Sequence, residues 1–302
     1  MAKILASDGM DTSAVRVLEE AGYEVVQEFF GPEELAEQVK NYDVLVVRSA
    51  TKVREPIIDA ALETGKLKLI IRGGVGVDNI DVAYAESKGI RVRNTPAASS
   101  ASVAEMVIGH MFCISRFIGA ANVSMRQGKW EKKKYKGVEI GGKVLGIIGI
   151  GRIGREVAKR ADALGMKVIY TDVMGAMDTL PYSFVSQDEL FAQADYITMH
   201  IPASKDAQPI ISAENIAKMK DGVYIINTAR GVLVDEDALC DALESGKVAG
   251  AALDVYNEEP CTNERLFSQP NVSLTPHVGA STKEAQKRIG EETVSIIREM
   301  FG

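Results

Sequence analysis

Residues 143–172 read KVLGIIGIGRIGREVAKRADALGMKVIYTD, and this stretch decides the fold class. It begins with a short apolar run, continues through a glycine-rich turn into an amphipathic segment, and ends in a second apolar run. Both runs are rich in Val and Ile without strict alternation of polar residues, which is typical of strands buried on both faces of a parallel sheet. The stretch therefore predicts a strand–helix–strand unit.

The same alternation of apolar runs and helical patterns extends over most of the chain. Helical patterns such as 12–21 and 235–245 separate the apolar runs, and each of the two is followed by a glycine. Beyond 143–172, the expected strands are 3–7, 23–27, 42–48, 68–72, 90–94, 196–200, 224–228, 250–255 and 272–276. Alternating strands and helices predict an α/β protein with doubly wound parallel sheets.

A change of pattern after residue 94 marks an expected boundary between domains. A chain of 302 residues favours two domains, at roughly 150 residues for each. Residues 99–127 form the longest helical pattern, with apolar side chains on most faces, so this helix must be buried between domains or against another subunit. A polar segment, 128–142, follows, and the last helical pattern, 281–301, is long enough to return to the first domain.

The composition excludes several classes of protein. With 46% hydrophobic and 25% charged residues, the chain has the make-up of a soluble globular protein rather than a disordered one. A net charge of −7 is opposite to that of a general binder of nucleic acids or anionic membranes. Cys113, Cys240 and Cys261 are too few and too far apart for a disulfide framework or a zinc site. The cysteines thus give no reason to expect a metal site. Since neither a signal peptide nor a bilayer-spanning apolar run is present, we expect a cytoplasmic protein.

The glycine-rich turn matches a dinucleotide-binding fingerprint. Gly149, Gly151 and Gly154 have G-x-G-x-x-G spacing between a strand and a helix, and Asp172 ends the next strand. The glycines would admit a pyrophosphate to the helix N-terminus. The Asp172 carboxylate would accept hydrogen bonds from the ribose hydroxyls and repel a 2′-phosphate, which favours NAD over NADP. A turn without a ligand and a methyltransferase loop are the alternatives.

Three histidines are the candidate acid–base groups. His110 lies within the long apolar helix and is interpreted as a packed helix residue. His200 and His277 each lie at the end of an expected strand, at the edge where open α/β sheets bind ligands. Pro276 would rigidify the approach to His277, and Gly279 would leave room for a cofactor ring, so position modestly favours His277.

Three further segments remain open on sequence alone. Arg230 follows an expected strand and could bind a carboxylate through its guanidinium, although a solvated arginine is equally consistent. Glu259 lies in a loop, and spacing does not single it out. The glycine-rich segment 72–79 could present backbone N–H groups to an anion, or form a flexible turn.

Together these segments resemble the D-2-hydroxyacid dehydrogenase family, and within it the phosphoglycerate dehydrogenases. The resemblance covers essentially the whole chain. Three elements in this order are specific to the family: an arginine, here Arg230, then Glu259-Pro260, and then Pro276-His277. The matching segments are RSATKV (48–53), RGGVGVDN (72–79), GKWEKK (128–133), GIGRIG (149–154), NTARG (227–231), ALDV (252–255), EP (259–260) and TPHVGAST (275–282).

The resemblance implies a domain arrangement and a set of site residues. A Rossmann NAD-binding domain, 95–277, would be inserted into a flavodoxin-like substrate-binding domain made of 1–94 and 278–302. A homodimer through the helical region 99–127 is also implied. The catalytic set would be Arg230, Glu259 and His277, and the backbone of Val75 and Gly76 would bind the substrate. The residues expected to contact NAD are Gly149, Gly151, Arg152, Ile153, Gly154, Asp172, Ile201, Thr228, Ala229, Asp254, Gly279 and Ala280.

The implied reaction is the NAD-dependent oxidation of 3-phospho-D-glycerate to 3-phosphohydroxypyruvate, the first step of serine synthesis. His277 would accept the hydroxyl proton beside Glu259, and Arg230 would bind the carboxylate. The phosphate needs further cations in a chain of net charge −7. Arg48 and Arg72 end first-domain strands, and Lys132 lies near Trp130 in a lysine run whose usual fate is to be solvated.

Two other functions fit the same residues. The first is a dehydrogenase for another 2-hydroxy acid, such as a glyoxylate or hydroxypyruvate reductase. The second is a non-catalytic NAD-sensing binding protein, which the presence of all three catalytic residues disfavours. Many phosphoglycerate dehydrogenases carry a C-terminal regulatory domain that binds serine, for which residues 1–302 hold no counterpart, so we expect no inhibition by serine.

Overall fold

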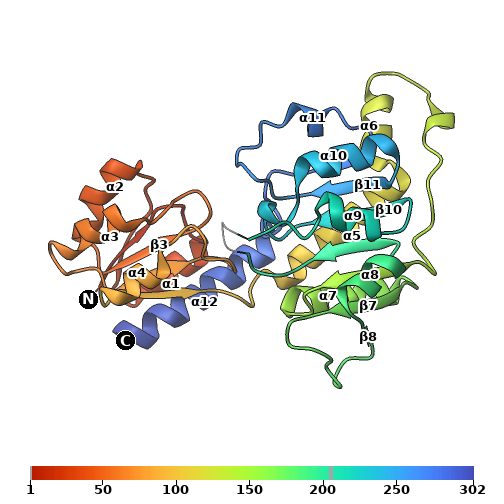
Figure 1. The fold of residues 1–302 in the computed structure, drawn as a ribbon. Coiled ribbons are helices and arrows are strands. Elements are labelled where there is room, and N and C mark those ends of the chain that lie inside the picture. Colours follow the sequence, from red (N-terminus) through yellow and green to blue (C-terminus); the bar gives the residue numbers. More distant parts are fainter. Residues whose placement is uncertain (1, 204–206) are drawn as a thin grey trace. The chain divides into compact units, whose positions relative to one another are not determined.

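The computed structural model describes residues 2–203 and 207–302 (Figure 1). Contacts divide the chain into two compact units, and each contains one parallel β-sheet. The first unit comprises Met1–Ser100 and Ala280–Gly302, and the second unit comprises Ala101–Gly279.

The unit bounds lie a few residues later in the chain than the domain bounds expected from the sequence, which were 94/95 and 277/278. Residues 95–100 stay with the first unit because hydrogen bonds hold them there. Thr95 donates its backbone N–H to the carbonyl of Gly74 at 3.0 Å, and Arg288 donates to the carbonyl of Ala98 at 2.8 Å.

The first unit is built on a five-stranded sheet in the order β2-β1-β3-β4-β5. Its strands are β1 (Lys3–Ala6), β2 (Glu24–Val26), β3 (Val44–Val47), β4 (Leu69–Arg72) and β5 (Arg91–Asn94). Its helices are α1 (Thr12–Glu20), α2 (Pro32–Gln38), α3 (Glu55–Leu62), α4 (Val82–Ser87) and α12 (Lys283–Phe301). The C-terminal helix α12 contacts α1, where a Cβ on Gly290 would lie only 2.7 Å from that of Ala14 (Figure 1). The absence of a side chain at Gly290 therefore permits this close packing.

The second unit is built on a seven-stranded sheet in the order β12-β11-β10-β9-β6-β7-β8. Its strands are β6 (Val144–Ile148), β7 (Lys167–Thr171), β8 (Ser183–Phe184), β9 (Tyr196–Met199), β10 (Val223–Asn227), β11 (Val248–Leu253) and β12 (Val272–Leu274). Its helices are α5 (Ser100–Arg116), α6 (Ile118–Arg126), α7 (Arg152–Ala163), α8 (Gln187–Gln193), α9 (Ala213–Lys218), α10 (Glu236–Ser245) and α11 (Glu264–Phe267). From β6 the chain order runs outward in both directions, so the switch point lies between β6 and β9, where open α/β sheets bind ligands.

Apolar cores cover both faces of the second sheet. Ile148 belongs to the cluster that includes residues of α8, α9 and α10, whereas its neighbour Ile147 belongs to the cluster that includes residues of α5 and α7. Successive strand residues point to opposite faces, and both faces are apolar, which explains why the strand sequences do not alternate. The predicted fold class, with two doubly wound parallel sheets, is confirmed.

The helix expected over 99–127 is two helices instead of one. The helices α5 and α6 meet at an angle of 66° around Phe117, whose φ of +55° lies in the left-handed region. A residue in that conformation cannot continue a right-handed helix. Among the described residues, no single helix is long and apolar enough to span a membrane, and only the bent pair α5–α6 passes that test by length and composition.

Candidate active site

The glycine turn after β6 has three glycines with different roles. Gly149 has a φ of +91°, and a Cβ there would lie 2.5 Å from a side-chain carbon of Ile201. A Cβ on Gly154 would lie 2.2 Å from the carbonyl oxygen of Gly149, so the helix α7 packs directly on the turn. Gly151 faces open space and caps α7 without a side-chain hydrogen bond. The backbone N–H groups of the first turn of α7 are therefore accessible to an anionic ligand.

Asp172 connects the end of β7 to this turn. One carboxylate oxygen accepts the backbone N–H of Ile150 at 2.9 Å, and the other accepts that of Met174 at 2.9 Å. Each oxygen can accept a further hydrogen bond. The sequence predicted only the ligand contact of Asp172, whereas the structure shows that it also fixes the glycine turn.

Within residues 2–203 and 207–302, two buried polar atoms at the ends of neighbouring strands have no hydrogen-bond partner. They are Oγ1 of Thr228, just after β10, and Nδ1 of His200, just after β9. A buried polar atom that lacks a partner costs free energy, so such atoms are often explained by a bound molecule. These two atoms and the open glycine turn fit a polar, phosphate-bearing ligand at this edge of the sheet.

His277 and Glu259 form a hydrogen-bonded pair. Nδ1 of His277 lies 2.8 Å from Oε2 of Glu259, and both side chains are about one-third exposed. Burial raises the pKa of Glu259, but the hydrogen bond and charge of His277, the N–H of Tyr256 and the charge of Arg230 outweigh it, so the net pKa lies below its usual value. Glu259 is therefore kept as a carboxylate facing the histidine ring.

A buried carboxylate, Asp254, holds the turn that carries His277. Asp254 is 1% exposed and accepts three hydrogen bonds: from the hydroxyl of Thr275 at 2.6 Å, and from the backbone N–H groups of Val278 at 2.9 Å and Gly279 at 2.8 Å. His277 lies between these anchors with a φ of +53°. The expected contact of Asp254 with NAD stays a prediction, and the structure adds that its carboxylate holds the backbone on both sides of His277.

His110 extends this network. The sequence predicted a packed helix residue, and His110 is indeed only 4% exposed, but both of its ring nitrogens are engaged. They lie 2.9 Å from the hydroxyl of Ser273 and 3.1 Å from that of Thr275. Since Thr275 donates its proton to Asp254, it must accept from His110, which places the ring proton on Nε2. Burial lowers the pKa of His110, in agreement with a neutral ring.

Arg230 lies beside the loop that carries Glu259. The buried side chain of Asn227 fixes the backbone here, because it donates to the carbonyl of Arg230 at 2.8 Å and accepts the N–H of Ala229 at 3.0 Å. A Cβ on Gly231 would lie 1.9 Å from the backbone of Tyr256, so this turn and the Glu259 loop touch. The structure thus brings Arg230, Glu259 and His277 together within the second unit.

The expected substrate residues of the first unit lie on two loops. One loop, 48–51, follows β3 and is held by Asp8, which accepts the N–H groups of Arg48 at 2.6 Å and Thr51 at 3.1 Å. Asn79 donates to the carbonyls of both residues at 2.7 Å. Asp8 and Asn79, which sequence reasoning missed, therefore give this loop a fixed shape.

The second loop, 72–79, follows β4 and carries Arg72, Val75 and Gly76. Gly74 has a φ of +152°, and a Cβ there would overlap the guanidinium of Arg72, which folds back over the loop. Asn94 donates to the carbonyl of Val75, which ties this loop to the end of β5. Lys132 is in the second unit, exposed in a short 3-10 helix, Lys132–Lys134.

The NAD contacts expected from the sequence lie after strands of the second sheet. Gly149, Gly151, Arg152, Ile153 and Gly154 follow β6, Asp172 follows β7, Ile201 follows β9, Thr228 and Ala229 follow β10, Asp254 follows β11, and Gly279 follows β12. Ala280 belongs to the first unit.

This arrangement agrees with what known proteins show. Residues 108–279 match the sequence model for the NAD binding domain of the D-isomer specific 2-hydroxyacid dehydrogenases. The chain belongs to this family. NAD is therefore the cofactor of this dehydrogenase, and the glycine turn, Asp172 and Thr228 fit it.

The relatives of this dehydrogenase include enzymes with different substrates. A hydroxypyruvate reductase of Thermotoga maritima is 49% identical over 99% of this chain and 98% of its own length. A D-3-phosphoglycerate dehydrogenase of Methanocaldococcus jannaschii is 46% identical over 100% of this chain, which spans only 58% of that protein. A solved structure, D-lactate dehydrogenase from Aquifex aeolicus with NAD and lactic acid, superposes with a TM-score of 0.84 at 31% identity and covers 98% of this chain and 94% of that chain.

His200 is unsuited to proton transfer in this dehydrogenase. Its Nε2 lies 3.0 Å from the hydroxyl of Thr198, its Nδ1 is buried, and burial lowers its pKa to about 3. A group that ionises so far below neutral pH is a poor general base. The structure therefore strengthens the preference for His277, which position alone favoured only modestly.

The buried His200 makes the second unit sensitive to acid. A histidine in an unfolded chain has a pKa near 6.5. Below that pH, the unfolded chain binds a proton at His200 that the folded chain does not bind. Stability should fall as the pH drops from about 6.5 toward the folded pKa of about 3. Between pH 7 and 5 we expect a loss of about 2 kcal/mol from His200, with a further loss from His110.

Urea unfolding followed by far-UV circular dichroism at pH 7, 6 and 5 measures this loss. Trp130 is 79% exposed, so its fluorescence is a poor probe. His200→Gln cannot gain a proton and should show a weaker dependence on pH. Equal stability of the wild type at pH 7 and pH 5 would contradict the prediction.

Proposed function

We propose that this dehydrogenase oxidises 3-phospho-D-glycerate to 3-phosphohydroxypyruvate with NAD. The observation that carries the proposal is the pair of His277 and Glu259, 2.8 Å apart, beside Arg230 at the ligand-binding edge of the second sheet. A histidine held by a carboxylate is a general base for a hydroxyl proton, and an adjacent arginine provides positive charge for a carboxylate substrate.

His277 would remove the proton of the C2 hydroxyl group. In the reactive tautomer, Nδ1 carries a hydrogen and donates a hydrogen bond to the Glu259 carboxylate. Nε2 carries no hydrogen and can therefore accept the proton of the substrate. The negative charge of Glu259 then stabilises the imidazolium that forms. NAD, when bound, accepts the hydride from C2.

Arg230 would bind the substrate carboxylate and polarise the oxygen that becomes the ketone. Asn227 holds the backbone of Ala229 and Arg230, so the arginine side chain extends from a fixed backbone position. A fixed positive group stabilises developing negative charge without reorganisation during the reaction.

The choice of 3-phosphoglycerate is supported by the two loops of the first unit. Arg48 and Arg72 lie at the carboxyl ends of adjacent strands, where Asp8 accepts hydrogen bonds from the first loop and Asn79 and Asn94 donate to the carbonyls of Arg48 and Val75. An arginine on a loop held in this way, such as Arg48, suits a phosphate, whereas the guanidinium of Arg72 is folded back over its own loop. The second candidate is the reduction of hydroxypyruvate, favoured by the full-length likeness to the Thermotoga maritima reductase.

The test is a panel of substrates. NADH formation at alkaline pH is measured with 3-phosphoglycerate, D-glycerate and D-lactate, and NADH consumption with hydroxypyruvate and glyoxylate. NADP is the second cofactor, and NAD should be preferred because Asp172 would repel a 2′-phosphate. A higher kcat/KM for D-glycerate than for 3-phosphoglycerate, with turnover of hydroxypyruvate, would select the reductase. NADH binding without turnover of any substrate would select a non-catalytic NAD-binding protein.

Arg48→Ala should raise the KM for 3-phosphoglycerate by about ten- to a hundredfold, the worth of one hydrogen bond between charged groups. The kcat should change less, because the phosphate is bound equally in the ground and transition states. Activity with D-glycerate should hardly change. Lys132→Ala should act in the same direction, with Lys133→Ala as its control, and an equal loss with both substrates would contradict a phosphate contact.

We also propose that a second copy of the chain covers the surface around α6. Large apolar side chains are exposed there, including Ile118 at 50%, Val123 at 55% and Met125 at 53%. Exposed apolar patches on this scale mark interaction sites. Sedimentation should show a dimer that Val123→Glu converts to a monomer, and a monomeric wild type would contradict the proposal.

A further inference from the structure

Glu259 lies in a loop whose two ends are bonded to one carboxylate. The segment 257–263 connects the region after β11 to the start of α11. At one end, the backbone N–H of Asn257 donates to Oε1 of Glu236 at 2.9 Å. At the other end, Nδ2 of Asn263 donates to Oε2 of the same residue at 2.7 Å. The two oxygens of Glu236 thus close the segment into a ring.

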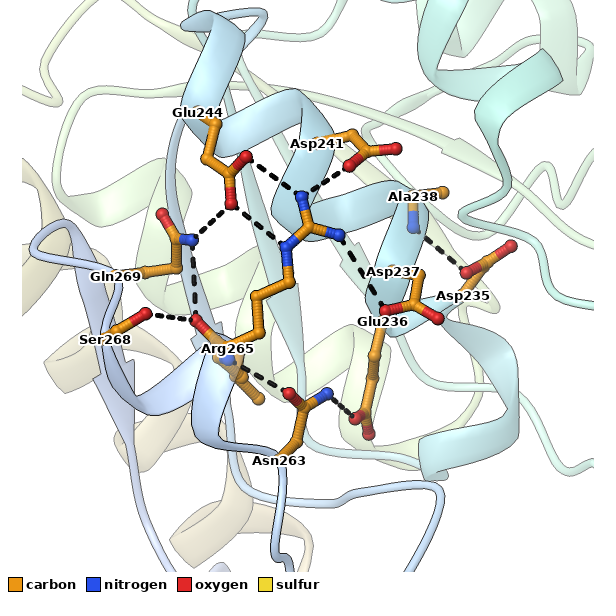
Figure 2. A network of polar contacts seen from close by, with 11 residues as sticks. Asp235, Glu236, Asp237, Ala238, Asp241, Glu244, Asn263, Arg265, Ser268 and Gln269 are labelled. Atoms are coloured by element: carbon orange, nitrogen blue, oxygen red, sulfur yellow. Dashed lines mark hydrogen bonds and ion pairs between the residues drawn. The ribbon is translucent and has the colours of Figure 1, made fainter.

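The position of Glu236 is itself fixed. It is the first residue of α10, directly after the N-cap Asp235, where a negative charge is favoured by the helix dipole. Asn263 cannot turn its amide group, because Oδ1 accepts the backbone N–H of Leu266 at 3.1 Å as the N-cap of α11. Figure 2 shows the bond between Asn263 and Glu236. Donor and acceptor therefore match in one orientation only.

A separate set of ion pairs joins the same two helices. Arg265 on α11 donates to Asp241 and, at 2.9 and 3.0 Å, to Glu244, both on α10 (Figure 2). These contacts are exposed and involve no residue of the segment 257–263. They provide a control that separates helix packing from loop position.

Next to Tyr256, the loop is packed too closely against the turn at Gly231 to move toward that turn. The backbone of Tyr256 lies against Gly231, where a Cβ would come within 1.9 Å, and the Tyr256 hydroxyl donates to the carbonyl of Thr275 at 2.9 Å. The backbone N–H of Tyr256 also donates to Glu259 at 3.2 Å. The end at Asn257 is also held by its own side chain, which donates to the carbonyl of Val234 at 3.2 Å, whereas the end at Asn263 is joined to α10 through Glu236.

We propose that Glu236 is a positioning residue that sets the contact between Glu259 and His277. It touches neither the substrate nor the cofactor, and it acts by holding both ends of the loop that carries Glu259. Hydrogen bonds to a charged acceptor are stronger than neutral ones, and here one charge supports two of them. The inference rests on the proposed role of the Glu259–His277 pair in catalysis.

The test exchanges the amide and carboxylate groups of Glu236 and Asn263, first one at a time and then together. Glu236→Gln turns an N–H₂ group toward the N–H₂ group of Asn263, and Asn263→Asp brings two carboxylates together. Each single variant should lower kcat/KM by about tenfold, because small displacements of a catalytic group are costly. In the double variant, the amide introduced on α10 can donate to the carboxylate introduced before α11, and that carboxylate still accepts the N–H of Leu266. The kcat/KM of the double variant should therefore return to within about threefold of the wild type.

A readout that a merely structural role would not move is the pH profile. In each single variant, the acid limb of the rate profile should move to lower pH, because the protonated ring loses part of its contact with Glu259. The ring titration of His277, followed by NMR and assigned with His277→Gln, should move in the same direction without any substrate present. Glu244→Gln, which weakens the contacts of Glu244 with Arg265 and Gln269 and none of the segment 257–263, should leave both midpoints in place.

These outcomes separate the inference from the proposed function. If the wild type oxidises no 2-hydroxy acid, the proposed function fails, and the ring titration still tests Glu236. Wild-type midpoints in Glu236→Gln would overturn the inference. It would also be overturned by a double variant that fails to recover, or by equal shifts in Glu244→Gln and Glu236→Gln.

Discussion

Replacing His277 with alanine should lower kcat by about 10³-fold or more, within the range lost when a general base is removed. NADH binding should change little, because the glycine turn and Asp172 belong to other loops of the second unit. His277 is about one-third exposed, so the change leaves no cavity in the core. Steady-state kinetics with the best substrate and an NADH titration measure the two quantities.

Glu259→Gln is the companion variant. It keeps the size of the side chain and removes its charge, so the loss in kcat should be smaller, about ten- to a hundredfold. The acid limb of the rate profile should move to lower pH, since the imidazolium loses its charged neighbour. A normal rate in His277→Ala would show that the base lies elsewhere, and the buried His200 could not readily take the role.

The glycine turn could be predicted from sequence because its causes are local. Gly149 needs a positive φ, and Gly154 needs close contact with a residue only five positions away. Strands such as β6, which is buried on both faces, also have a local signature in their run of apolar residues. Local steric demands leave a pattern in neighbouring residues, and the pattern was sufficient for the fold class and for the turn.

The break between α5 and α6 left no such pattern. Phe117 adopts the left-handed conformation without a glycine or proline at that position. A distant segment stabilises the end of α5 instead: the N–H of Val138 donates to the carbonyl of Ser115 at 3.0 Å, and Gly137 packs directly against that oxygen. Such a tertiary contact overrides helix propensity, and the residues around the break do not reveal it.

The residues that hold the candidate site were missed for a similar reason. His110 bonds to Ser273, which lies 163 positions away, and Asp8 bonds to Arg48, which lies 40 positions away. A histidine on an apolar helix and an aspartate after a strand have ordinary structural explanations. Their roles depend on which strands become neighbours in the sheet, and a single sequence gives no direct measure of that.

Arg230 should be the other residue whose loss is severe. Arg230→Ala removes both the carboxylate contact and the charge beside the developing ketone oxygen. We expect kcat to fall by about 10²- to 10³-fold, as when a donor to such an oxygen is lost, and KM for 2-hydroxy acids to rise as well. The fold should persist, because Asn227 bonds to the backbone of Arg230 and not to its side chain.

Two further measurements assign the roles of this arginine. Arg230→Lys keeps the charge but cannot form a two-pronged contact, so it should recover part of kcat and little of KM. Added guanidinium ion should restore some activity to Arg230→Ala by occupying the space of the lost group. If Arg230→Ala raises KM alone and leaves kcat intact, the guanidinium binds the carboxylate equally in the ground and transition states. The polarisation of the ketone oxygen would then have to come from another group near the Glu259–His277 pair.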